Sequence, residues 1–316
     1  LITGFDRMRL HYVAFSRAEK ILVLTTVNPP KTHFNAICQG LPQWPYVQQN
    51  LLNSLSFNLR QRTAIRKSFS FTSDLKVYET CPRQYEFFRF YQFTPSRSAE
   101  YFFGSLVHQS IEDIHRWAMD GQASSLTDVR IRELFDQNYQ NLLIRRFRPI
   151  GPVQRDQAFS QVEHYFVQNK SDFHRILETE VDVSVEKDDY ILTGKIDLLL
   201  GGDGKLELLD FKSQPRPIVP DAISSYYKQL CIYAHILETR DGKRPDRLLI
   251  YWTAEKTKEK AVMSFPYNYN AVGEAGVHFD GVVKSILNRE FSIKQVPEQK
   301  VCKECDLKVY CANEGL

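Results

Sequence analysis

The sequence predicts an α/β protein with a mixed central sheet flanked by helices and with a helical N-terminal portion. Apolar residues recur mostly at helical spacing over residues 71–177, and after residue 177 the pattern changes to short strand-like runs separated by turn sequences. Of the 316 residues, 43% are hydrophobic and 25% charged, which is typical of a globular chain with a sizeable core. The formal net charge of +3 permits nucleic-acid binding but does not argue for it.

The patterns divide the chain into three segments. Residues 1–27 contain a short helical stretch and an apolar run typical of a buried strand. Residues 28–70, which several prolines interrupt, are predicted to form a connector that ends in a helix. Residues 71–316 carry the rest of the pattern as one domain. Because the chain starts at Leu1 and enters in mid-pattern, we expect a piece of a longer polypeptide.

Within the third segment, the first helix is predicted to begin at Ser73, a good N-cap residue, and an amphipathic helix should cover about 101–118. A mostly helical region should continue to about Leu177. Strands at 181–185, 190–200 and 205–211, joined by turn sequences at 187–189 and 201–204, predict antiparallel hairpins. The remaining elements are expected to be a helix near 223–237, strands near 247–253 and 261–265, and a helix near 272–287.

The sequence has no apolar run of about 18 residues and no signal-peptide pattern. We therefore expect a cytoplasmic protein without a membrane partner. Six cysteines in such a compartment do not indicate a disulfide framework. Cys38 and Cys231 stand alone and are predicted to be buried structural thiols.

Two carboxylates interrupt apolar strands, Asp197 in GKIDLLL and Asp210 in LLDFKSQ. A buried charge costs several kcal/mol unless a partner or a metal compensates it, so we expect something to bind there. Carboxylates that converge from adjacent strands suit Mg²⁺ or Mn²⁺, and Lys212 lies on the same strand face as Asp210. The alternative for an isolated D-x-K is an ordinary cross-strand ion pair between Asp197 and Lys212.

Flanking residues strengthen the case for a site. His108 follows Gly104 at the start of the predicted 101–118 helix and is a further candidate metal ligand, although a lone histidine is more often structural. Gln229 and Tyr233 are four residues apart, so they share one face of a helix.

Together, G-x-x-x-H at 104–108, G-x-x-D at 194–197, D-x-K at 210–212 and Q-x-x-x-Y at 229–233 resemble the RecB-like branch of the PD-(D/E)xK nuclease superfamily, over residues 71–311. The resemblance implies a restriction-endonuclease-like core and a metal-dependent DNA exo- or endonuclease. Its implied metal ligands are His108, Asp197, Asp210 and the carbonyl of Phe211. It further implies that Lys212 serves the hydrolytic water, and that Gln229 and Tyr233 contact DNA or brace the site.

Four cysteines need a separate explanation. Cys302, Cys305 and Cys311 form a compact trio near the C-terminus, and Cys81 stands far upstream before a proline. The residues alone leave zinc and iron–sulfur ligation open. Because the nuclease motifs lie between Cys81 and the trio, the arrangement resembles the iron–sulfur RecB-like nucleases of the AddB type and of some CRISPR adaptation enzymes. That resemblance implies one [4Fe-4S] cluster, held by these four residues, that joins the two ends of the domain.

The N-terminal sequence YVAFSRA at 12–18 resembles the last motif of superfamily 1 helicases of the UvrD and RecB type. There Arg17 would reach the γ-phosphate of ATP in the parent helicase, although taken alone it is equally a helix-surface cation. A phosphate-binding G-x-x-x-x-G-K-[ST] loop is missing from this sequence, so we expect no ATP hydrolysis by this piece.

The combined resemblances imply a nucleoid-associated helicase–nuclease that acts in DNA repair or recombination on single-stranded DNA or on DNA ends. The implied partners are an upstream helicase domain of the same chain and a second subunit. Two alternatives stay open at this point: a catalytically silent DNA-end-binding module, and a nuclease that cleaves RNA.

Overall fold

The computed structural model describes residues 67–93, 99–145, 148–294 and 296–313. The chain divides into two units, residues 1–63 and 64–316, and all described residues belong to the second. The predicted helicase motif with Arg17, most of the predicted connector, and Cys38 lie outside the described residues. The boundaries proposed for the three segments therefore stay predictions.

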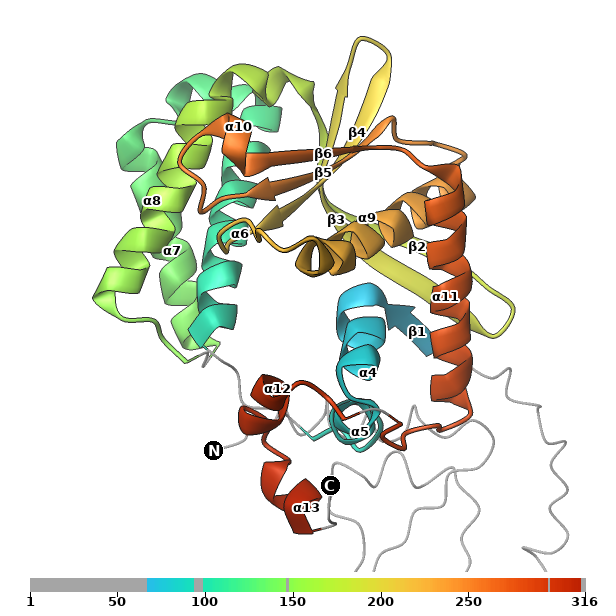
Figure 1. Ribbon diagram of the computed structural model, residues 1–316. Helices are drawn as coiled ribbons and strands as arrows, with labels where there is room; N and C mark the ends of the chain where they lie inside the picture. The colour runs from blue at the N-terminus through green and yellow to red at the C-terminus, as the bar shows by residue number, and fades with distance from the viewer. Residues whose placement is uncertain (1–66, 94–98, 146–147, 295, 314–316) are drawn as a thin grey trace, which may run out of the picture. The chain divides into compact units, whose positions relative to one another are not determined.

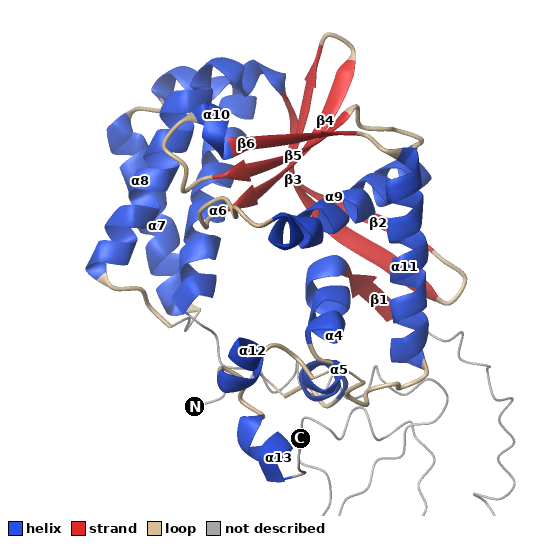
Figure 2. Cartoon of the chain, viewed as in Figure 1, coloured by secondary structure: helices blue, strands red, loops and turns tan. Residues whose placement is uncertain are grey.

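A mixed six-stranded sheet forms the centre of the described part (Figures 1 and 2). The strand order is β1-β3-β4-β5-β6, and β2 pairs with β3 beside this path. The long strand β3 pairs antiparallel with β2 and β4 and parallel with β1, and β4 pairs parallel with β5. The strands are β1 (Lys67–Ser70), β2 (Ile176–Glu186), β3 (Tyr190–Gly202), β4 (Lys205–Lys212), β5 (Arg247–Trp252) and β6 (Val262–Pro266).

Helices cover both faces of this sheet, each over its own apolar core (Figure 1). One core lies under α9 and α11 and includes Ile196, Leu230 and Phe279. The other lies under α6, α7 and α8 and includes Leu106, Phe135 and Phe211. The long helices are α6 (Ala99–Trp117), α7 (Asp128–Ile144), α8 (Pro152–Asn169), α9 (Pro220–Asp241) and α11 (Tyr269–Leu287).

Short helices occupy the lower end of the described part in Figure 1. There α12 and α13, near the C-terminus, lie beside α5, which begins just after Cys81. The early and late parts of the domain thus meet at one place. The helices at this end are α5 (Pro82–Tyr85), α12 (Gln299–Lys303) and α13 (Lys308–Asn313), and α4 (Lys76–Thr80) leads into α5. A further short helix, α10 (Lys258–Ala261), lies at the opposite end of the view, near β6. None of the helices in the described ranges has the length and apolar character needed to span a membrane.

The predicted fold class is confirmed, as are the three antiparallel strands and the later helices and strands. Two local predictions are wrong. The first helical turn is capped by Ser70, whose hydroxyl accepts a hydrogen bond from the Ser73 amide at 3.2 Å, rather than by Ser73. Residues 67–70, expected to end a connector as a helix, form β1, because Phe69 buries its ring against Tyr190 of β3.

Candidate active site

The two strand carboxylates lie on adjacent strands at the centre of the sheet. The β3–β4 register pairs Leu198 with Leu209, which places Asp197 and Asp210 next to each other along the ladder. The Phe211 amide donates a hydrogen bond to Asp197 Oδ2 at 2.7 Å. Asp210 is only 3% exposed, so its charge is compensated within the protein or by a bound cation.

Lys212 compensates Asp210 rather than Asp197. Its Nζ forms an ion pair with Asp210 Oδ2 and donates to Gln229 Oε1 at 3.1 Å. Gln229 in turn donates through Nε2 to Asp210 Oδ1 at 3.0 Å and to the Tyr233 hydroxyl at 2.9 Å. The Q-x-x-x-Y face of α9 therefore braces the D-x-K strand, and the simple Asp197–Lys212 pair considered above is not what forms.

His108 reaches the same place from α6. Its Nδ1 lies 3.6 Å from Asp197 Oδ2. Burial and the nearby Lys212 ammonium lower the pKa of His108 to about 4, although Asp210 and the Phe211 carbonyl act in the opposite direction. The imidazole is therefore neutral at pH 7, the state in which histidine ligates metals.

The two carboxylates of this site repel each other. Burial and the Asp210 carboxylate raise the pKa of Asp197 well above its usual range. Burial alone would lower the pKa of Lys212, but Asp210 and Asp197 outweigh it and raise that pKa. Two carboxylates lie close together beside Lys212, so a divalent ion would relieve the repulsion that raises the pKa of Asp197. The carboxylates, the neutral imidazole and the Phe211 carbonyl fit Mg²⁺ or Mn²⁺.

Close packing explains a glycine of the motifs. A Cβ on Gly194 would lie 2.9 Å from Cε1 of Tyr233. Only glycine at position 194 therefore lets β3 pack directly against the Tyr233 ring, whose hydroxyl accepts a hydrogen bond from Gln229.

Sequence reasoning missed three residues at this site. Glu180 of β2 joins His108 and Asp197 in a group whose ligand atoms all lie within 4.8 Å of one another. Lys76 of α4 is close enough for the Lys212 charge to contribute, after burial, to lowering its pKa. Tyr226 lies under both lysines, with Nζ to ring-centroid distances of 6.0 Å for Lys76 and 5.4 Å for Lys212. None of the three belongs to a recognised spacing, and Glu180 follows the polar side of an alternating strand, which predicts a solvated residue.

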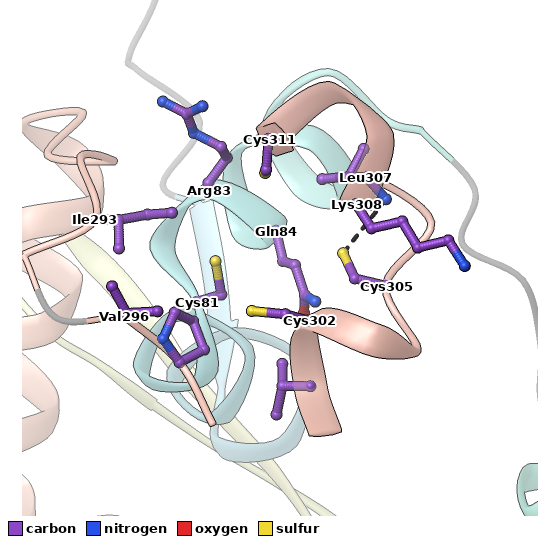
Figure 3. Close-up of a pocket in the computed structure, with 12 residues that line it drawn as sticks. Cys81, Arg83, Gln84, Ile293, Val296, Cys302, Cys305, Leu307, Lys308 and Cys311 are labelled. Carbon is purple, nitrogen blue, oxygen red and sulfur yellow. Dashed lines mark hydrogen bonds between the residues drawn. The ribbon is translucent and has the colours of Figure 1, made fainter. Parts of the chain in front are cut away.

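The four predicted cluster cysteines line one cavity of about 110 Å³ between α5 and the C-terminal helices (Figure 3). Cys81 is buried and Cys302 is exposed. Cys305 Sγ accepts a hydrogen bond from the Leu307 amide at 3.3 Å. Within the described ranges, no three of these thiols lie within 4.8 Å of one another. The four cysteines predicted to bind one cluster therefore line the same cavity without forming a compact group of ligand atoms. The cluster stays a prediction.

Comparisons with known proteins agree with this geometry. The chain belongs to the PD-(D/E)XK nuclease superfamily, whose family model matches residues 68–312. No curated protein matches the chain.

Solved structures give more distant likenesses. A candidate exonuclease from Eubacterium rectale is 14% identical, covering 67% of this chain and 90% of that one, with a TM-score of 0.39. The protein SSO0001 is 13% identical, covering 65% of this chain and 84% of that one, with a TM-score of 0.30. The protein VC1899 from Vibrio cholerae is 14% identical, covering 62% of each chain, with a TM-score of 0.22.

Proposed function

We propose that this chain contains the metal-dependent DNA nuclease module of a helicase–nuclease that acts in DNA repair or recombination. The observation that carries the proposal is the convergence of His108, Asp197, Asp210 and Lys212, which come from α6, β3 and β4, on one partly buried place. The superfamily match over the same residues supports it. The substrate would be single-stranded DNA or a DNA end.

Each side chain has a defined task in this proposal. Asp197, Asp210, His108 and the Phe211 carbonyl would hold Mg²⁺ or Mn²⁺, which supplies Lewis-acid polarisation of the phosphate and a more acidic bound water. The Lys212 ammonium would orient that water or offset charge on the phosphate. Gln229 would keep Asp210 and Lys212 in place, and its bond to Tyr233 fixes the orientation of its own amide.

The test is degradation of DNA by purified chain. Single-stranded DNA labelled at the 5′ or 3′ end should be degraded in Mg²⁺ and left intact in EDTA, and Asp210→Ala should abolish cleavage while DNA binding survives. If Asp210→Ala cuts at the wild-type rate, the site is assigned wrongly. If the wild type binds DNA ends and never cuts them, the chain is an end-binding module instead. Labelled RNA in parallel reveals RNA cleavage.

The proposal includes a [4Fe-4S] cluster held by Cys81, Cys302, Cys305 and Cys311. Its support is that all four line one cavity and that the Leu307 amide donates a hydrogen bond to Cys305 Sγ, a contact that is common around metal-bound thiolates. A single zinc ion, with Zn–S bonds of about 2.3 Å, would need sulfurs roughly 3.8 Å apart. In a [4Fe-4S] cluster each thiolate binds a different iron atom, so wider separations suffice.

The helicase context rests on the N-terminal motif with Arg17. It predicts that this chain alone has no DNA-stimulated ATPase activity, because the phosphate-binding loop is missing from its sequence. ATP turnover by pure protein above the buffer background would contradict it. Copurification with a longer helicase subunit from the native host would support a second subunit.

A further inference from the structure

At Glu180, the neighbouring strands β2 and β3 change which of the two apolar cores their side chains enter. The β2–β3 ladder pairs Thr179 with Leu198 and Val181 with Ile196, so Glu180 lies opposite Asp197. Val181 and Ile196 belong to the core under α9, whereas Leu198 belongs to the core under α6. Residues two apart in a regular strand share a face, so the side chains of each strand switch from one face to the other at Glu180 and Asp197.

The backbone of Glu180 makes this change of face. Its φ of 52° lies in the left-handed region, which is unusual for a residue other than glycine. The carboxylate of this residue is largely shielded from solvent. Its side chain is 13% exposed, and one of its oxygens lies within 4.8 Å of ligand atoms of His108 and Asp197.

A chain of hydrogen bonds from Thr179 through His115 to Tyr165 supports this change of face. The Thr179 hydroxyl donates to the Asp197 carbonyl at 3.2 Å and lies 3.3 Å from His115 Nδ1. His115 Nε2 lies 2.7 Å from the Tyr165 hydroxyl. With the proton on Nδ1, every group has a partner: Tyr165 donates to His115, and His115 donates to Thr179. Glu180 is thereby fixed next to Asp197 by buried groups of α6 and α8.

Glu180 has a replaceable partner. Lys195 Nζ pairs with Glu180 Oε2 at 2.6 Å, but the Lys195 side chain is 52% exposed. A lysine at this exposure swings into solvent at little cost. The ion pair is thus able to open when a more strongly charged ion approaches.

We propose that Glu180 is a ligand of the divalent cation at this nuclease site, together with His108 and Asp197, and that Lys195 is the counter-ion which the cation displaces. The inference rests on the proposed function for the position of the site, and it adds a carboxylate that lies outside the nuclease motifs. Oxygen and neutral imidazole donors in one group suit Mn²⁺ and Mg²⁺. Glu180 and Lys195 should therefore affect cation affinity in opposite directions.

Calorimetric titration of the full chain with Mn²⁺ alone tests this without any nucleic acid. Glu180→Gln removes the charge and keeps the shape, and should weaken Mn²⁺ binding at least tenfold. Lys195→Gln frees the carboxylate and should raise the affinity about threefold. Glu178→Gln, on an exposed residue two positions earlier in β2, is the matched control and should bind Mn²⁺ as the wild type does.

The outcomes separate the inference from the proposed function. Mn²⁺ binding by Glu180→Gln within twofold of the wild type, or Mn²⁺ binding by Lys195→Gln no tighter than that of the wild type, overturns the inference whether or not DNA is cleaved. A wild type that binds Mn²⁺ through Glu180 and yet cleaves no DNA sinks the proposed function and leaves the inference standing. If Glu180→Gln does not fold, the Lys195→Gln titration decides alone: tighter binding supports the ligand role, and equal or weaker binding refutes it.

Discussion

The candidate active site and the cysteine cavity hold their side chains in different ways. At the candidate active site, hydrogen bonds and ion pairs between protein groups connect Asp197, Asp210, Lys212 and Gln229. In the cavity, Cys305 Sγ accepts a backbone hydrogen bond, but the thiols are not gathered into a ligand group. The first site lies on central strands between two cores, and the second lies among short helices.

This difference indicates which of the two sites depends on its ligand for its structure. A site built on a packed sheet keeps its geometry when the ion leaves, because neighbouring strands and helices determine each side chain's position. Short helices bury little and need a cross-link to stay together. Removing the divalent ion should therefore stop the chemistry and leave the fold intact, whereas removing the proposed cluster should loosen the fold.

The largest expected effect comes from Lys212→Met. Cleavage should fall on the order of 10²–10³-fold, because an ammonium aimed at the reacting phosphate acts in a site sheltered from water. Mn²⁺ binding should persist or strengthen, because Lys212 no longer occupies Asp210. Rates on labelled DNA and Mn²⁺ titration measure the two effects. Lys205→Met, at an exposed position of the same strand, is the control. Normal cleavage by the Lys212→Met protein would contradict the role proposed for Lys212 at the candidate active site.

The next effect concerns the cavity. Purified protein should be brown and absorb broadly near 400 nm, and Cys81→Ser should lose the colour and about 2–5 kcal/mol of unfolding free energy, as loss of a long-range cross-link does. Thermal melting and absorbance measure this. Activity should fall only as the protein unfolds.

Two controls sharpen the cysteine result. Cys231 is buried, with a pKa raised to about 11 by burial, and Cys231→Ala should keep the colour. Cys38→Ala should do the same. Metal analysis of protein purified without oxygen that gives about one zinc and no iron per chain would replace the cluster with a zinc site.

The sequence was sufficient for features that local pattern determines. The hairpins over β2, β3 and β4 followed from alternation and turn residues, and motif spacing located Asp197, Asp210, Lys212 and His108, which the structure brings together. Glu180 was missed because its position depends on a left-handed residue in the middle of a strand, which strand alternation cannot anticipate. Strand β1 was missed because four residues acquire their strand character only by pairing with β3.

A smaller effect is expected from Gly194→Ala. The added Cβ would lie 2.9 Å from the Tyr233 ring, so either β3 or α9 must shift, at a cost of about 1–3 kcal/mol. Urea unfolding measures the loss, and cleavage should decrease because Tyr233 bonds to Gln229. Gly273→Ala on α11 is the control, since its Cβ meets no atom within 4 Å. Equal stability of Gly194→Ala and the wild type would show that the ring moves aside freely.

The smallest effect tests the buried support beneath the active site. Burial lowers the pKa of His115 to about 3, whereas an unfolded histidine has a pKa of about 6.5. Between these values the unfolded chain binds a proton that the folded chain does not, so the free energy of unfolding falls as the pH drops below 6.5. His115 alone should remove about 1.4 kcal/mol at pH 5.5 relative to pH 8. His115→Gln keeps one donor and one acceptor and should flatten that slope. Urea unfolding at both pH values measures it. If His115→Gln loses as much stability on acidification as the wild type, the groups that destabilise the fold in acid lie elsewhere, and the hydrogen bonds from Tyr165 to Asp197 are not the pH-sensitive support of this site.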